Sequence, residues 1–343
     1  MKLQNKIVVG TLVQFYEMEM LPELLYSYSK MLENIENPEN VYFDFCFSTQ
    51  EFLEKIDEDY FWEKYKAGSA NSMEMEFKRQ VVEANLPNVH WGWVGDYSYF
   101  FNIAKYRRDL CREWCEKVDI IVFGESDTLL GSKSLQLIDI LHENVKNQTP
   151  KYVANFAGRL NWDSSWSKIT HPMFRSVKYE ETDEFIFGHI ASEKSYMTYA
   201  QMEEINDIPP EDIVVVSFNQ PKADGAGLII SSDLIRSGVN IPINLIHCGE
   251  DESLLQIAKK LMGDQFVQYH VANYLRVHNR RHPKKRTGVL NENNPNGKCS
   301  VADKGVWWDI LEKTSKHNLN TLFQQTPSHQ LKDVLMEIEK VTP

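Results

Sequence analysis

Cysteines and long apolar runs are both scarce in this sequence. Five cysteines among 343 residues form no dense framework, and their odd number favours free thiols in a reducing compartment. No stretch approaches the roughly 18 consecutive apolar residues of a transmembrane helix. The apolar run near the N-terminus is interrupted by Gln14 and Glu17, unlike the apolar core of a signal peptide. We therefore expect a soluble, cytoplasmic protein without a membrane anchor.

Positive charge is also limited. Lys and Arg total 37 against 49 Asp and Glu, so the formal net charge is −12. Such a surface disfavours non-specific binding of nucleic acids and other polyanions. The exception is the segment 276–286, in which six of eleven residues are Lys or Arg. A run of this kind is usually a solvated surface, but it can also neutralise phosphates.

The remaining composition is that of a globular protein, with 42% hydrophobic and 12% aromatic residues. An apolar run at 7–12, helical spacing at 21–35 and a second apolar run at 41–47 predict a β-α-β opening with parallel strands. We expect an α/β fold with a mixed, mostly parallel sheet flanked by helices. Later patterns predict strands at 88–94, 120–123, 213–218, 227–230 and 268–277, and helices at 50–85, 99–117 and 253–262.

The C-terminal part has a different pattern. Residues 291–298 are rich in Asn, Gly and Pro, which is typical of a loop or linker. Two helical stretches follow, at 303–323 and 328–340. We expect a main domain over 1–290 and a C-terminal helical extension over 291–343 that packs on it.

Two carboxylates follow the buried strand predicted at 120–123. Glu125 and Asp127 flank Ser126, and open α/β sheets bind ligands at the carboxyl ends of their strands. Carboxylate oxygens suit Mg²⁺ or Mn²⁺. The motif predicts a metal site, although a polar turn that closes the strand would have the same sequence.

A second acidic motif, Gly249-Glu250-Asp251, opens the helix predicted at 253–262. Acidic residues are electrostatically favourable at a helix start, so the motif also fits simple capping. It follows the apolar run 243–246, which we expect to be a short strand. An aspartate at such a strand end can act as a general base if it reaches an acceptor hydroxyl.

The basic segment 276–286 directly follows the strand predicted at 268–277. Cations placed there can neutralise a diphosphate leaving group or hold a nucleic-acid backbone. His278, at the end of the same strand, is a candidate third metal ligand.

The order of these motifs resembles that of the GT-A glycosyltransferases, especially family-2-like members. The resemblance covers about residues 5 to 285, and Glu-x-Asp stands where the family usually has Asp-x-Asp. The matching segments are Val8-Val9-Gly10-Thr11-Leu12, Tyr106-Arg107-Arg108-Asp109, Glu125-Ser126-Asp127, Asp224-Gly225-Ala226-Gly227-Leu228-Ile229-Ile230, Gly249-Glu250-Asp251 and Val277-His278.

This resemblance implies a GT-A enzyme that takes a sugar from a nucleotide-sugar donor, with a UDP-sugar favoured. Asp127, Glu125 and His278 would hold Mn²⁺ or Mg²⁺ on the donor diphosphate. Asp251, with Glu250 beside it, would deprotonate the acceptor hydroxyl and so give inversion at the anomeric carbon. The resemblance also implies donor contacts by Thr11, Leu12, Arg108, Arg280, Arg281 and Lys284.

The acceptor is left open. Some phage enzymes of this type glycosylate hydroxymethylated pyrimidines in DNA, which the segment 276–286 would suit; the protein would then work in the host cytoplasm. A glycan, a lipid-linked sugar or a small molecule is the alternative acceptor. Two other functions also remain. A sugar-phosphate nucleotidyltransferase would normally have a glycine-rich phosphate loop after the first strand, and a non-catalytic binding module would use Asp127 and Asp251 only as caps.

Overall fold

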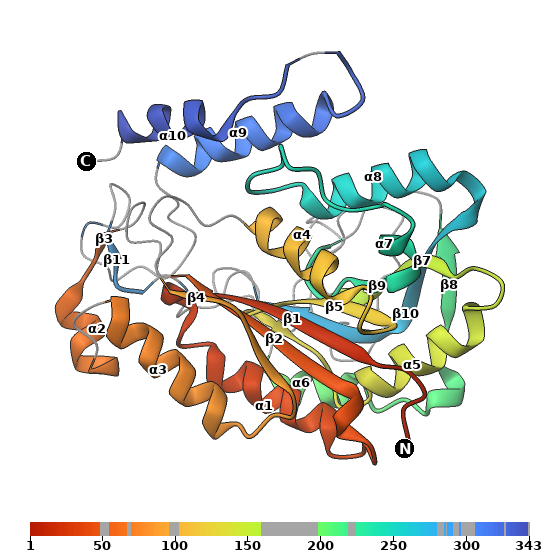
Figure 1. Ribbon diagram of the computed structural model, residues 1–343. Helices are drawn as coiled ribbons and strands as arrows, with labels where there is room; N and C mark the ends of the chain where they lie inside the picture. Colours follow the sequence, from red (N-terminus) through yellow and green to blue (C-terminus); the bar gives the residue numbers. More distant parts are fainter. Residues whose placement is uncertain are drawn as a thin grey trace, which may run out of the picture.

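The computed structural model of the chain is shown in Figure 1. It describes residues 1–48, 55–66, 70–95, 103–158, 198–218, 224–279, 285, 287–290, 295, 306–325 and 327–341.

A mixed sheet forms the centre of the described structure. Its strands lie in the order β4, β2, β1, β5, β9, β7, β10 and β6, and β8 pairs with β10. β4, β2, β1 and β5 are parallel, β9 is antiparallel to both of its neighbours, and β10 is parallel to β7. The predicted mixed, mostly parallel α/β sheet is confirmed. The strands are β1 (Ile7–Gln14), β2 (Val41–Ser48), β4 (Val89–Gly95), β5 (Ile120–Glu125), β6 (Thr128–Leu129), β7 (Lys151–Gly158), β8 (Val215–Phe218), β9 (Ile229–Ser231) and β10 (Phe266–His278).

Residues of β1 alternate between two apolar cores, one on each face of the sheet. Ile7, Val9 and Val13 pack in one core, whereas Val8 and Leu12 pack in the other. Figure 1 shows the helices of the first core below the sheet and those of the second above it. The first group is α1 (Leu21–Leu32), α2 (Glu58–Tyr65), α3 (Ala70–Glu83) and α5 (Ser134–Val145), and the second is α4 (Ile103–Trp114), α7 (Ser232–Arg236) and α8 (Glu250–Met262). A strand covered on both faces needs apolar residues at nearly every position, as β1 has.

The remaining elements lie at the edges of this arrangement. Helix α6 (Tyr199–Ile205) contacts β10. A separate two-stranded sheet pairs β3 (Lys55–Ile56) with β11 (Val289–Leu290). Helices α9 (Val306–Asn320) and α10 (Leu331–Glu339) pack on each other and form the predicted helical appendage, beyond α4 and α8 in Figure 1. Among the described residues, no helix combines the length and the apolar character needed to cross a bilayer.

The sequence prediction differs from the structure in several places. The run 243–246 was expected to be a strand, but residues 243–244 form a turn and 245–246 have no regular secondary structure. Ile243 is 85% exposed, whereas Leu245 and Ile246 are buried. Pro242 precedes this run, and its carbonyl oxygen binds Arg108 instead of a neighbouring strand. Helices α5, α6 and α7 and strands β3, β6, β7 and β11 were not predicted. Strand β7 and helix α6 lie within residues 150–212, a stretch rich in aromatic and polar residues whose periodicity is weak.

Candidate active site

Glu125 and Asp127 lie where the strand order of the sheet reverses. Of the four parallel strands, the first in sequence, β1, lies beside both the second, β2, and the fourth, β5. Leu12 of β1 is paired with Glu125, the last residue of β5, and the Ser126 amide donates to the Leu12 carbonyl oxygen at 3.2 Å. Sheets of this kind bind ligands outside the carboxyl ends of the strands at such a switch point. Glu125 and Asp127 therefore occupy the expected position for a ligand site.

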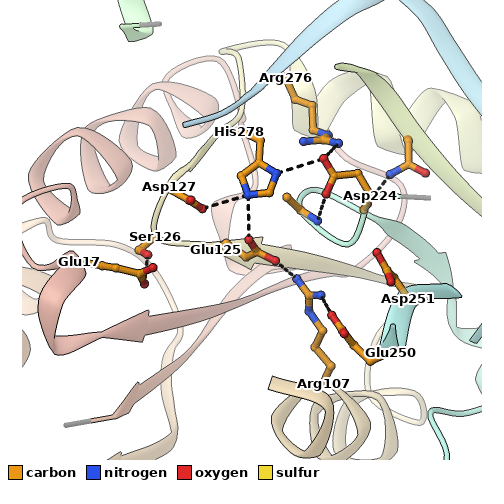
Figure 2. A network of polar contacts seen from close by, with 12 residues as sticks. Glu17, Arg107, Glu125, Ser126, Asp127, Asp224, Glu250, Asp251, Arg276 and His278 are labelled. Carbon is orange, nitrogen blue, oxygen red and sulfur yellow. Dashed lines mark hydrogen bonds and ion pairs between the residues drawn. The ribbon is translucent and has the colours of Figure 1, made fainter. Parts of the chain in front are cut away.

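His278 reaches the same place from the far side of the sheet. It is the last residue of β10, is paired with Thr128 of β6, and precedes Asn279, whose amide donates to the Asp127 carbonyl oxygen at 2.7 Å. The His278 Nε2 atom lies 3.2 Å from Glu125 Oε2 and 3.4 Å from Asp127 Oδ1 (Figure 2). The structure thus brings together the three residues that the sequence predicted as metal ligands.

The chemistry of this group fits a divalent cation. One ligand atom from each of Glu125, Asp127 and His278 lies within 4.8 Å of the others. Two carboxylates with one imidazole suit Mn²⁺, which accepts nitrogen more readily than Mg²⁺ does. The second ring nitrogen of His278 lies 3.1 Å from Asp224 Oδ2, and a carboxylate in this position commonly orients a metal-binding histidine. The residues present can therefore hold Mn²⁺ or Mg²⁺.

Electrostatics keep His278 and Glu125 charged before a cation binds. Burial alone would lower the pKa of His278, but attraction to Asp224 and Asp127 and hydrogen bonds to Asp224 and Glu125 raise that pKa to about 9. Burial works against the ionised form of Glu125, yet Arg107 and His278 hold the pKa of this carboxyl below its ordinary value. Since a histidine must be neutral to ligate a metal, cation binding here would release a proton.

A second group of Asp44, His90 and Glu113 also has ligand atoms within 4.8 Å of one another. The Asp44 carboxylate already accepts hydrogen bonds from Tyr106 at 2.9 Å and Trp114 at 2.9 Å, and it lies 2.6 Å from His90. These contacts tie α4 to β2 and β4. We interpret this group as a structural network.

Arg107 connects the metal-site carboxylates with the second acidic motif. Its side chain is 2% exposed, Nη2 donates to Glu125, and Nη1 donates to Glu250 at the start of α8 (Figure 2). The guanidinium carbon lies 4.8 Å from the centre of the Phe123 ring. Helix α4 can approach the sheet here because residue 10 is glycine: a Cβ at that position would lie 2.1 Å from a methyl carbon of Leu110.

Sequence reasoning selected the neighbouring arginine instead. Arg108 points away from the acidic residues, and its Nη1 donates to the Pro242 carbonyl oxygen at 3.0 Å. Consecutive residues on a helix point in directions about 100° apart, so only one of the pair can face the site. The donor contact of Arg108 stays a prediction, whereas Arg107, which sequence reasoning did not select, is the arginine that binds Glu125 and Glu250.

Asp251 lies beside this ion pair. A Cβ added to Gly225 would lie 2.3 Å from Arg107 Nη1 and 3.2 Å from Asp251 Oδ2, so the two side chains flank the same glycine. Burial first, and then repulsion from Glu250, raise the pKa of Asp251 to about 8 despite the opposing effect of Arg107. A carboxyl with such a pKa is a stronger base than an ordinary aspartate. Glu250, by contrast, is buried and held by Arg107.

The C-terminal helices hold the turn that leads into Asp251. Asn318 of α9 is fully buried and donates to the Asn244 carbonyl oxygen at 2.8 Å, and the Cys248 amide donates to Ser315 Oγ at 3.3 Å. A Cβ at Gly249, whose φ is +77°, would lie 3.2 Å from Leu319. Helix α9 therefore fixes the backbone immediately before α8.

Glu17 and Lys285 complete the cluster of charged side chains around Asp127. Sequence reasoning did not predict either of them as a site residue. Glu17 follows the end of β1, is buried, and accepts a hydrogen bond from Ser126. Lys285 Nζ lies 2.8 Å from Asp127 Oδ2 and 2.9 Å from Glu17 Oε1. The strand-end rule that selected Glu125 applies equally to Glu17, whereas nothing in the sequence distinguishes Lys285 from the other cations of its segment.

The other predicted donor contacts are less direct. The Thr11 hydroxyl is buried and lies 2.7 Å from the Tyr28 hydroxyl, and the Leu12 side chain is buried in the core with α4. Both side chains therefore serve the interior, which leaves only their backbone near the end of β1 to meet a ligand. Arg280, Arg281 and Lys284 lie outside the described residues.

Comparisons with known proteins give no family assignment. No protein-family model and no curated protein matches the sequence. Among solved structures, S. aureus TarS 1–349 has 13% sequence identity and a TM-score of 0.38, covering 98% of this chain and 81% of that one. Glucosyl-3-phosphoglycerate synthase from Mycobacterium tuberculosis, in complex with Mn²⁺, UDP-glucose and glycerol 3-phosphate, has 12% identity and a TM-score of 0.40, covering 88% of this chain and 83% of that one. TM-scores of this size do not by themselves establish a shared fold.

Proposed function

We propose that this chain is a metal-dependent GT-A-type glycosyltransferase that moves a sugar from a nucleotide-sugar, with a UDP-sugar favoured, to an acceptor hydroxyl. One observation carries the proposal: Glu125 and Asp127 at the switch point of the sheet meet His278, while Arg107 links Glu125 to the motif that contains Asp251. The motif order of the sequence supports the same assignment. Residues 1–290 would form the catalytic domain and 291–343 the extension that supports it.

The donor diphosphate would lie at the carboxyl ends of β1 and β5. A divalent cation bound by Glu125, Asp127 and His278 would supply Lewis-acid stabilisation of the negative charge on the departing nucleoside diphosphate. Asp224 would keep the His278 ring oriented toward this charge. Arg107 would hold Glu125 in place and is itself fixed by Glu250.

Asp251 would act as the general base. The acceptor oxygen would form a bond to the anomeric carbon as the bond from that carbon to the diphosphate oxygen breaks, and Asp251 would take the hydroxyl proton. Direct attack from the face opposite the leaving group inverts the anomeric configuration. A base with a pKa near the working pH suits this role.

The acceptor is better sought among glycans, lipid-linked sugars and small molecules than in DNA. Two cations of the basic segment, Arg276 and Lys285, are paired with carboxylates within the protein. They are therefore not displayed for a nucleic-acid backbone. The net charge of −12 also disfavours DNA.

The test is a panel of nucleotide-sugars incubated with the full chain, with and without Mn²⁺. We expect Mn²⁺-dependent release of UDP from one donor, and faster release once an acceptor is added. Duplex DNA with and without hydroxymethylated pyrimidines should be one arm of the acceptor panel. Pyrophosphate release from a nucleoside triphosphate and a sugar phosphate, without UDP release from any UDP-sugar, would instead identify a nucleotidyltransferase.

A further inference from the structure

The two oxygens of the Asp127 carboxylate face two different cationic groups. Oδ1 lies 3.4 Å from His278 Nε2, on the side shared with Glu125. Oδ2 lies 2.8 Å from Lys285 Nζ, on the side shared with Glu17. Asp127 is therefore common to the proposed metal site and to a separate site that an ammonium group of the same chain fills.

The Lys285 site is built from buried groups. The side chains of Asp127 and Glu17 are 1% and 9% exposed, and that of Lys285 is 21% exposed. Glu17 is fixed by hydrogen bonds from the Ser126 hydroxyl and from the backbone N–H of Gln14, the latter at 3.1 Å. The carboxylates that receive the ammonium group are thus held in position by the ends of β1 and β5.

From this arrangement we infer that Lys285 competes with the divalent cation for Asp127, and that the nucleoside diphosphate relieves the competition by drawing Lys285 away. The inference rests on the proposed function, because it assumes that Asp127 is a metal ligand.

The reason is electrostatic. A cation bound to Oδ1 of Asp127 would lie close to the ammonium group on Oδ2 of the same carboxylate, and like charges at such a distance repel strongly in a buried site. Lys285 also withdraws part of the negative charge that the cation needs. A diphosphate at this edge of the sheet offers Lys285 other anionic oxygens, with which ammonium groups form strong charge-assisted hydrogen bonds. Metal and nucleotide would then bind cooperatively, each favouring the other.

The test measures Mn²⁺ binding to the full chain by calorimetry, first alone and then with saturating UDP. Lys285→Met keeps most of the side chain's length and removes its charge. Lys285→Arg keeps the charge. Lys64→Met is the matched control, because Lys64 pairs with Glu19 at 2.9 Å, another carboxylate shortly after β1, and does not contact Asp127.

Without UDP, we expect Lys285→Met to bind Mn²⁺ on the order of tenfold more tightly than the wild type. Lys285→Arg and Lys64→Met should bind as the wild type does. UDP should tighten Mn²⁺ binding by the wild type much more than by Lys285→Met. A thermal melt of every variant shows whether it is folded. Lys285→Gln, which also removes the charge, replaces Lys285→Met in the test if the methionine variant does not fold.

Equal or weaker Mn²⁺ binding by folded Lys285→Met or Lys285→Gln would overturn the inference and leave the proposed glycosyl transfer intact. Failure of every variant to bind Mn²⁺, with or without UDP, would overturn both. Tight binding by the two uncharged variants, with no detectable binding by the wild type until UDP is added, would support the competition in its strongest form.

Discussion

Arg107, near the middle of α4, donates a hydrogen bond to Glu125 at the end of β5. The other terminal nitrogen of the same guanidinium binds Glu250 on α8, so one fully buried cation fixes both acidic motifs that the sequence singled out. The motifs are more than a hundred residues apart in the chain. Their relative placement depends on an arginine that belongs to neither.

Replacing Arg107 should therefore abolish the proposed sugar transfer. In Arg107→Met, Glu250 would remain buried without its cation and Glu125 would keep only His278 as a cationic partner among the described residues. Breaking a buried pair in this way typically costs about 3–5 kcal/mol of stability. We expect sugar transfer to fall by at least ~100-fold even at temperatures where the variant is folded. Arg107→Lys should recover part of the stability but less of the activity, since an ammonium group cannot span both carboxylates.

Arg108→Met is the matched comparison in these assays, measured by UDP release and thermal melting. It removes an adjacent arginine whose side chain donates a hydrogen bond to the Pro242 carbonyl oxygen. A loss of transfer in Arg108→Met as large as in Arg107→Met would mean that the sequence-based choice of Arg108 was right.

The pH dependence of transfer should reflect Asp251. Its pKa of about 8 means that the carboxyl is mostly protonated at pH 7 and becomes an effective base only as the pH rises. We expect kcat/KM to increase through pH 7 and level off above about pH 8, and Asp251→Asn to bind UDP normally while losing transfer. A flat profile between pH 6 and pH 9 would exclude Asp251 as the base.

The raised pKa of Asp251 also makes the free energy of unfolding depend on pH. The folded state binds the Asp251 proton more tightly than the unfolded chain, whose aspartate has an ordinary pKa near 3.8. The stabilisation from this proton is complete below that value and is lost as the pH rises toward about 8. Denaturant unfolding should therefore show a smaller fall in stability over this range for Asp251→Asn than for the wild type.

Removing the proposed metal ligands should abolish transfer. Treatment with EDTA is expected to stop UDP release reversibly, and Asp127→Asn or His278→Gln should weaken Mn²⁺ binding severely, because each removes one of three ligands. His90→Gln is the control, since His90 also lies between carboxylates but belongs to the network around Asp44. Loss of Mn²⁺ binding in His90→Gln alone would place the metal in that second group.

Helix α9 should affect the position of Asp251, the proposed base, although α9 itself lies outside the proposed active site. Asn318→Ala removes the hydrogen bond to the Asn244 carbonyl oxygen and leaves buried partners unsatisfied, at a typical cost of about 1–3 kcal/mol. Within the described part of the chain, the Asn318 side chain hydrogen-bonds to the turn before α8 and to the segment before α10. We therefore expect kcat to fall while Mn²⁺ affinity is unchanged. Steady-state kinetics beside Mn²⁺ titration would separate this effect from general loss of structure, which would lower both.

The sequence by itself determined the α/β class, the parallel opening and most helices and strands. Strand β1 could be predicted because both of its faces are covered, so its residues are mostly apolar. The start of α8 could be predicted because acidic residues are favourable there. The sequence also predicted that Glu125, Asp127 and His278 lie together, because strand ends in such sheets face ligands and these residue types commonly bind metals.

Only the tertiary structure decided which other side chains complete the site. Arg107 and Arg108 are identical in type and adjacent, and the rotation of α4 against β1, permitted by Gly10, selects the first. Lys285 is one of several cations in its segment, and the fold brings it to Asp127 and Glu17. Burial raises the pKa of Asp251, and burial is a property of the packed chain that local sequence does not encode.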